Sequence, residues 1–240
     1  MTVLSITLAL RHTLQATAHV PNLLAHLMLP ALAVAILSAG MRFSFEQEHP
    51  ALVIPSLLEL WLGITLSANM ARLAVLGPDD LTNPGRAAWH LGRRELVVLV
   101  MNMLVAAPFF VSLAVFGAIG AGSTNAGPAM GVLFALAVAG GAWVALRLSL
   151  APVAAALDLP APAKVSWRTS DGIVLKLFLL GLACTPVHLP WFLLQVTAPD
   201  SVLAGMLAGI LQVIAMTFSW LALGFAFRQA REMQTDPTTS

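Results

Sequence analysis

The residues that could do chemistry in this sequence are polar side chains that stand inside otherwise apolar stretches. Glu59 is the acidic residue well inside one such stretch, and His188 occupies a similar place in a later one. Each lies about eight residues, or roughly 12 Å along a helix, from the end of its stretch. A carboxylate and an imidazole at matching depth could pair, and Gln212 and Asn102 could complete a polar interior around them.

Two interpretations of these four side chains follow. In the first, they form a proton-coupled or ligand-binding site at the centre of a helical bundle, because ionisable groups inside a membrane are costly and usually functional. In the second, they hydrogen-bond helices to one another, with Glu59 protonated or reaching water near the end of its helix. The sequence leaves both interpretations open.

Motifs for catalysis or metal binding do not occur. The sequence has no His-Glu-x-x-His, no glycine-rich phosphate loop with a lysine and no Cys-x-x-Cys. The histidines are dispersed along the chain, and Cys184 is the single cysteine, which excludes an intrachain disulfide. We therefore expect no catalytic residues, no cofactor and no metal.

The composition indicates the solvent in which the chain folds. Of 240 residues, 59% are hydrophobic and 10% are charged, whereas a soluble domain carries about 25% charged residues. The mean hydropathy is +0.88. A net charge of +1 provides no basic field for a polyanion, so we expect no nucleic-acid partner. The composition predicts a polytopic membrane protein.

Six stretches are long and apolar enough to cross a bilayer as helices, which takes about 20 residues each. They cover residues 21–41, 52–76, 96–121, 128–146, 173–196 and 202–227. The runs are continuous and do not alternate, so they are not barrel strands. We predict an all-α bundle of six transmembrane helices as a single domain over 1–233. An amphipathic interfacial helix precedes the first span, and 234–240 form a short tail.

The distribution of cations predicts the orientation. If the N-terminus is cytoplasmic, eleven of the 12 Lys and Arg residues fall on the cytoplasmic side and Arg42 alone falls outside. This asymmetry matches the positive-inside rule. We therefore predict that both termini are cytoplasmic.

The two longer cytoplasmic loops, 77–94 and 152–172, each place a tryptophan beside cations, and we expect both loops to lie on the membrane surface. The residues expected to face lipid there are Arg72, Trp89, Arg93, Arg94, Arg147, Trp167 and Arg168. The order arginine, tryptophan, glycine recurs in both segments, as in a parallel duplication. Recognition of lipid headgroups and ordinary topology signalling both explain the cations.

Small residues predict where helices approach one another. Gly205 and Gly209 form a Gly-xxx-Gly pair in the last span, and Gly140 and Gly141 lie in the fourth. This spacing lets backbones pack closely in lipid. The partner helix could belong to the same chain or to a second copy.

The run from Arg147 to Asp158, followed by Ser166-Trp167-Arg168-Thr169-Ser170-Asp171-Gly172, resembles bacterial inner-membrane proteins of the YciC type. It is also similar to the membrane domain attached to some glycerophosphodiester phosphodiesterases. The segments 72–77 and 92–95 resemble parts of uncharacterised bacterial relatives, whereas the proline-rich segment 159–163 departs from the pattern. The resemblance implies a six-helix membrane module. The phosphodiesterase activity does not carry over, because the residues of that catalytic domain have no counterpart here.

From these observations we expect an inner-membrane protein without catalytic activity that serves as a scaffold or assembly factor. Its expected partners are membrane lipids and either a partner membrane protein or a second copy of the chain. The alternative is a small transporter for a lipid or an apolar solute, which would use the polar residues of the second, fifth and sixth spans.

Overall fold

The computed structural model describes residues 4–44, 49–81, 83–122 and 128–235, with the backbone alone for 109, 113, 116–122, 128–130 and 235. The described residues form helices and connecting turns, without a strand among them. Five helical segments are long and apolar enough to cross a membrane. This finding confirms an all-α fold of the multi-pass membrane type.

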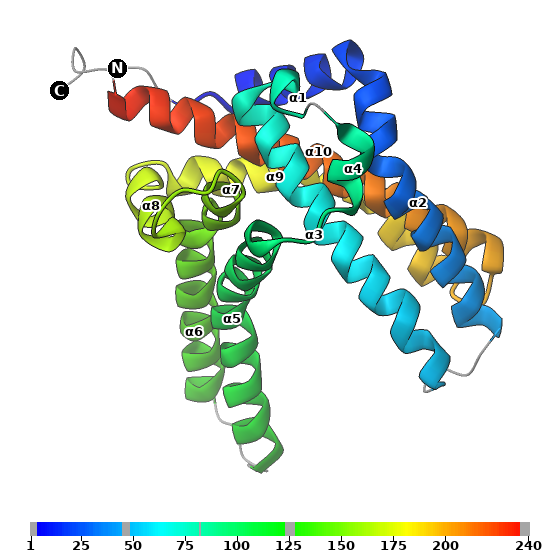
Figure 1. Ribbon diagram of the computed structural model, residues 1–240. Helices are drawn as coiled ribbons and strands as arrows, with labels where there is room; N and C mark the ends of the chain where they lie inside the picture. Colours follow the sequence, from blue (N-terminus) through cyan, green and yellow to red (C-terminus); the bar gives the residue numbers. More distant parts are fainter. Residues whose placement is uncertain (1–3, 45–48, 82, 123–127, 236–240) are drawn as a thin grey trace.

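The long helices pair as three hairpins (Figure 1). These are α2 (Pro21–Ser44) with α3 (Val53–Leu76), α5 (Arg93–Gly122) with α6 (Pro128–Leu148), and α9 (Val174–Thr197) with α10 (Val202–Thr235). Each predicted stretch coincides with one long helix to within a few residues, except that α10 continues well past residue 227. Residues 234 and 235, predicted as tail, are therefore helical, and 236–240 lie outside the described residues.

Helix α10 is the centre of one group of helices, because it packs along α2, α3 and α9. The α5–α6 hairpin extends away from this group at an angle (Figure 1). It joins the rest of the chain through α7 (Ala151–Ala156), α8 (Pro162–Thr169) and the neighbouring long helices α3 and α9. The two helices of this hairpin otherwise pack mainly on each other.

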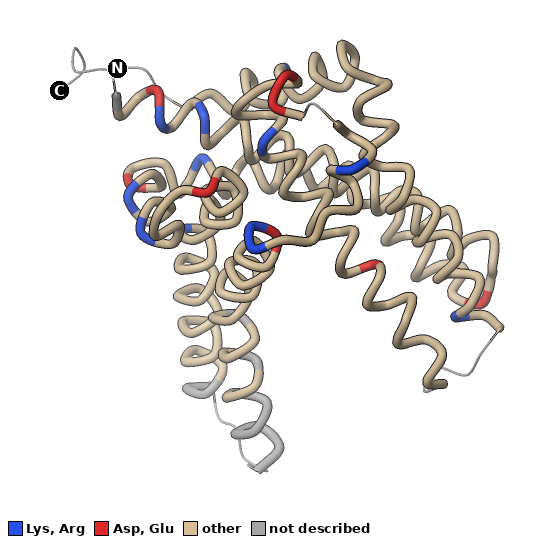
Figure 2. The backbone as a smooth tube through the Cα atoms, viewed as in Figure 1, with Lys and Arg blue, Asp and Glu red and all other residues tan. Residues whose placement is uncertain are grey.

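Short helices gather at one end of the molecule, which we call the basic end. They are α1 (Ile6–His19), η2 (Pro78–Asp80), α4 (Pro84–Trp89), α7 and α8. The opposite end, which we call the hairpin end, holds the α2–α3 and α9–α10 connections and η1 (Pro50–Leu52). Figure 2 shows Lys and Arg gathered toward the basic end, whereas Arg42, in the last turn of α2, lies at the hairpin end.

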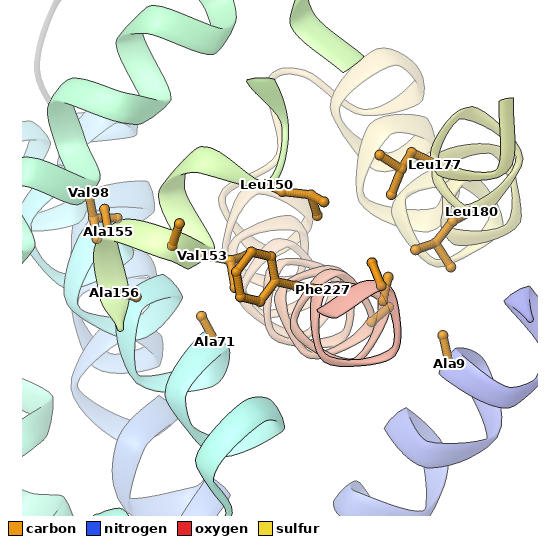
Figure 3. Close-up of a cluster of buried hydrophobic side chains, with 14 of the residues drawn as sticks. Ala9, Ala71, Val98, Leu150, Val153, Ala155, Ala156, Leu177, Leu180 and Phe227 are labelled. Carbon is orange, nitrogen blue, oxygen red and sulfur yellow. The ribbon is translucent and has the colours of Figure 1, made fainter. Parts of the chain in front are cut away.

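A core at the basic end surrounds α7. Every residue of α7 is buried, as is Leu150 before it. Phe227 of α10 packs beside Leu150 and Val153, with Val98 of α5 nearby (Figure 3). The expectation that 152–172 lies on the surface is therefore wrong for its first part. Helix α7 consists of alanine, proline and valine alone, so its insertion buries no polar side chain.

The second part of that loop does lie at the surface. Helix α8 starts at a proline, which suits the first helical turn because it has no N–H to leave unpaired. Trp167 and Arg168 are exposed on it, whereas Ser166 and Thr169 are buried. The loop thus divides into an inserted helix and an amphipathic surface helix.

Candidate functional site

Glu59 pairs with Arg42 and not with His188. The Arg42 Nη2 atom lies 2.6 Å from Glu59 Oε2, across the facing ends of α2 and α3. The two side chains are 53% and 32% exposed, so the pair is open to the surface. His188 is on α9, where its hydrogen-bond partners among the described residues are Ser219 of α10 and Trp191 of the same helix. Equal depth in the sequence therefore did not bring the carboxylate and the imidazole together.

Glu59 and Gln212 line the same small cavity of about 70 Å³ between α2, α3 and α10, with Gly63 and Gly209 on its wall. No hydrogen bond joins the Gln212 amide to a described residue. Two of the four polar residues singled out in the sequence therefore share a cavity, without a hydrogen bond between them.

His188 belongs to a separate contact between α9 and α10. Its Nε2 atom lies 2.8 Å from Ser219 Oγ, and Trp191 Nε1 donates to its Nδ1 at 3.3 Å. An indole N–H can only donate, so Nδ1 is the acceptor and Nε2 of the neutral ring carries the hydrogen. His188 then donates to Ser219 and cannot take a proton from it. The arrangement fastens two helices and does not activate a serine nucleophile.

Asn102 does not join either group. Its side-chain amide donates to the carbonyl of Val98, one turn earlier on α5, at 3.0 Å. A bond to the same helix satisfies the amide without a partner helix.

The glycines of α10 approach a helix of the same chain. A Cβ on Gly205 would lie 2.6 Å from Cε2 of Phe43, and one on Gly209 would lie 3.2 Å from Cβ of Ala35. Both neighbours are on α2, so the Gly-xxx-Gly pair forms an intrachain contact. Gly224, which the sequence interpretation missed, has an equally close contact with Ala74 of α3, where a Cβ would lie 2.6 Å from Cβ of Ala74.

The two glycines of α6 differ in their surroundings. A Cβ on Gly141 would lie 3.1 Å from the carbonyl oxygen of Pro108 on α5. The same atom on Gly140 would have no neighbour within 4 Å among the described residues. Gly141 therefore sets the separation of α5 and α6, whereas Gly140 faces outward.

Arg72 is turned inward at the basic end. It donates to both carboxylate oxygens of Asp80, at 2.6 and 2.7 Å, and to the carbonyl of Ala156 at 3.3 Å. Asp158, just beyond α7, lies 3.6 Å from Arg72 and 2.9 Å from Arg94 of α5. The Arg72 side chain is only 14% exposed. These two arginines tie α3, α5 and the end of α7 together, and Arg72 offers little surface to a lipid, whereas Arg94 is 31% exposed.

Arg147, in the last turn of α6, lies between two indole rings. Its guanidinium carbon is 5.1 Å from the ring centroid of Trp143 and 5.2 Å from that of Trp167, a cation–π geometry. The guanidinium also pairs with Asp171 at 3.0 Å, and the Arg147 carbonyl accepts hydrogen bonds from Ser166 and Ser170. This cluster fastens α8 to the end of α6.

The tryptophans of the two loops make matching contacts. Trp167 meets Trp143 edge to face with centroids 5.5 Å apart, and Trp89 meets Trp61 in the same way at 6.3 Å. Each loop tryptophan thus packs on a tryptophan of the preceding long helix. The recurrence seen in the sequence extends to Trp61 and Trp143, which the sequence interpretation did not single out.

Glu95 is a buried charge that the sequence interpretation missed. It is 3% exposed and accepts a hydrogen bond from the backbone N–H of Gly92 at 2.8 Å, and His90 lies 3.3 Å away. Glu95 is the third residue of α5, so this bond is half of a capping box at the positive end of the helix. The sequence does contain the pattern of this cap, because Glu95 stands three residues after Gly92 and directly before an apolar run.

Unpaired cations remain at the surface of the basic end. Among the described residues, six cations have no ion-pair partner: Arg11, Arg86, Arg93, Lys164, Arg168 and Lys176. Trp89 and Trp167 are exposed among them. Arg93, Trp89, Trp167 and Arg168 are therefore exposed, in contrast to Arg72.

No family model matches the chain, and neither does any curated protein or solved structure. The functional conclusion therefore rests on the contacts of this chain.

Proposed function

We propose that the protein is a non-catalytic scaffold of the bacterial inner membrane that holds lipids and a partner membrane protein beside it. In this proposal α5 also crosses the membrane, which brings the number of spans from five to six. Both termini are then cytoplasmic, and the basic end faces the cytoplasm. The resemblance to proteins of the YciC type supports the six-span layout. Helix α1 would lie in the interface, since it exposes Leu8 and Leu14 together with Arg11.

The observation that carries the proposal is the α5–α6 hairpin, which extends from the rest of the bundle. Apolar side chains on both helices are exposed, including Val111, Val115, Val132 and Leu136. The hairpin is anchored at its base by α7 and α8. Along the rest of its length, its outer faces are open to lipid or to another helix (Figure 1). A fixed base with an open apolar arm presents a surface and does not enclose a substrate.

The basic end supports the lipid part of this proposal. Arg72, Arg94 and Arg147 are used internally and hold the short helices in place, so that the unpaired cations are carried on a fixed frame. A cation close to an anionic leaflet contributes about 1 kcal/mol to binding. Six such cations toward the basic end, with two exposed tryptophans, suit an anionic membrane surface.

Site-specific photo-crosslinking in native membranes tests the scaffold. A photoreactive phenylalanine analogue replaces Val111 or Leu136 on the hairpin, and Leu189, exposed on α9, serves as the matched control. We expect a discrete protein adduct from the hairpin positions and lipid adducts alone from the control. Lipid adducts alone at all three positions would contradict a partner bound to the hairpin.

A small transporter for a lipid or apolar solute is the second candidate, and the cavity shared by Glu59 and Gln212 supports it. Against transport, buried apolar side chains of α3 and α10 pack together between this cavity and the basic end, among them Met70, Leu73 and Leu221. The variant Glu59→Gln separates the two functions. Loss of substrate movement in proteoliposomes at unchanged thermal stability supports transport, whereas loss of stability alone supports a packing role.

A further inference from the structure

A hollow at the hairpin end lies between the facing ends of α2 and α3 and the α9–α10 connection. Its volume is about 540 Å³, which is within the range of small-molecule sites. We call it the hairpin-end hollow. It is lined by polar Arg42, Ser56, Gln195 and Asp200 and by apolar residues such as Phe43 and Leu194. It is separate from the basic end and from the α5–α6 hairpin.

Arg42 brings a positioned guanidinium to this hollow. Its Nη2 atom bonds Glu59 at 2.6 Å, yet the side chain remains 53% exposed. A guanidinium has five N–H donors in a rigid fork, and most of those of Arg42 have no partner among the described residues. Glu59 holds the fork in place, which reduces the entropy that a ligand would have to restrain. A phosphate is the anion whose oxygens fit such a fork.

Asp200 brings a carboxylate to the same hollow. It is exposed and makes no ion pair with any described residue. The Gln195 side chain on the wall likewise has no hydrogen bond to another described residue. An ammonium group with N–H donors suits an unpaired carboxylate and an amide oxygen. The lining of one hollow therefore includes a group suited to a phosphate and a group suited to an ammonium.

We propose that the hairpin-end hollow binds the headgroup of a phospholipid that carries a primary ammonium, as phosphatidylethanolamine does. The phosphate lies on Arg42 and the ammonium on Asp200. A lipid is favoured over a free headgroup because exposed apolar side chains adjoin the lining residues along the chain on both hairpins, Val53 and Leu57 on α3 and Leu193 and Val196 on α9. The acyl chains would lie along these side chains.

The same chemistry discriminates among headgroups. A choline headgroup has the phosphate and the positive charge, but its quaternary nitrogen has no N–H to donate to Asp200. A phosphatidylglycerol headgroup has no positive charge and would meet the Asp200 carboxylate with a net repulsion. We therefore expect the ethanolamine lipid to bind more tightly than either of the others.

Native mass spectrometry of the full chain in mild detergent tests this proposal. The protein is delipidated and titrated with ethanolamine, choline and glycerol phospholipids of identical acyl chains. We expect the ethanolamine lipid to be retained better than the choline lipid, which has the same net charge and therefore the same attraction to the basic end. Asp200→Asn should lower its retention about tenfold, toward that of the choline lipid, as for loss of one charge-assisted bond. Arg42→Ala should lower both lipids together, because both have the phosphate.

The matched control is Asp79→Asn, which removes an exposed carboxylate of η2 at the opposite end that has no ion pair with a described residue, and it should leave the headgroup preference unchanged. Equal retention of the three lipids by the natural protein would overturn the proposal, as would an unchanged preference in Asp200→Asn. Asp200 makes no ion pair with a described residue, so this variant decides the matter even if Arg42→Ala fails to fold. Displacement of the bound lipid by soluble phosphoethanolamine at similar concentration would show that the headgroup alone is sufficient for binding. That result would overturn the assignment of a lipid as the ligand.

Discussion

The guanidinium of Arg72 and the carboxylate of Asp80 form a two-bond fork, with Nε to Oδ2 at 2.6 Å and Nη2 to Oδ1 at 2.7 Å. The fork closes the turn that follows α3. The same Arg72 side chain also donates to the carbonyl of Ala156, the last residue of α7. Because Arg72 is largely shielded, water cannot easily replace the contact. The relative placement of α3, η2 and α7 depends on this arginine.

We predict that Arg72→Ala destabilises the protein by about 3 kcal/mol, because Asp80 would remain partly buried without its partner. Arg72→Lys should recover only part of this loss, since an ammonium cannot form the fork. Thermal unfolding in detergent, followed by tryptophan fluorescence, measures the effect. Arg93→Ala is the control, because Arg93 is exposed and unpaired among the described residues. Equal losses for Arg72→Ala and Arg93→Ala would contradict the role of the fork.

The adjacent glycines of α6 provide a matched pair of substitutions. Gly141→Ala places a Cβ 3.1 Å from the Pro108 carbonyl and should force α5 and α6 apart, at a cost of about 1–3 kcal/mol. Gly140→Ala meets open space and should be neutral or slightly stabilising, because alanine favours a helix. Thermal unfolding of both variants tests the packing. The assignment is wrong if Gly140→Ala is the more harmful change.

Arg147→Leu should release α8 from the end of α6. The change removes the Asp171 ion pair and both cation–π contacts, and it leaves a shorter, apolar side chain in their place. We expect faster proteolysis in the 157–172 segment, because a released helix exposes its backbone. The cleavage rate by a protease added to the purified protein is the measurement. Arg168→Leu, on the exposed face of α8, should cleave at the natural rate, and a similar acceleration in both would contradict the prediction.

Cysteine labelling tests the orientation. In a Cys184→Ala background, Gly85→Cys on α4 and Ser44→Cys at the end of α2 each place one thiol at an exposed position. We expect an impermeant maleimide to label Ser44→Cys in intact cells and Gly85→Cys only after the cytoplasmic side is opened, as the positive-inside rule requires. Labelling of Gly85→Cys in intact cells would overturn the proposed topology.

The long helices and the separation of charge were predictable from the sequence. A bilayer requires an apolar run of a certain length, and it penalises each cation on the wrong side independently of what surrounds it. Both requirements act residue by residue along the chain. The stretches 52–76 and 173–196 consequently match α3 and α9 almost residue for residue. The close contacts of Gly205 and Gly209 were predictable for a similar reason, because a missing side chain marks a close approach whatever the partner.

The partners of the polar residues were decided by the tertiary structure. The depth of Glu59 in its helix can be read from the sequence, but the direction in which its side chain points cannot. In the structure this side chain points toward Arg42 of the adjoining helix, whereas His188 contacts Ser219. In the same way, the sequence shows that 151–156 are small and apolar, which suits the membrane surface and the protein interior alike. The structure buries them because the splayed hairpin and α10 leave room there that only small side chains fill. Depth and polarity are properties of a residue, whereas contact depends on how several helices are rotated about their axes.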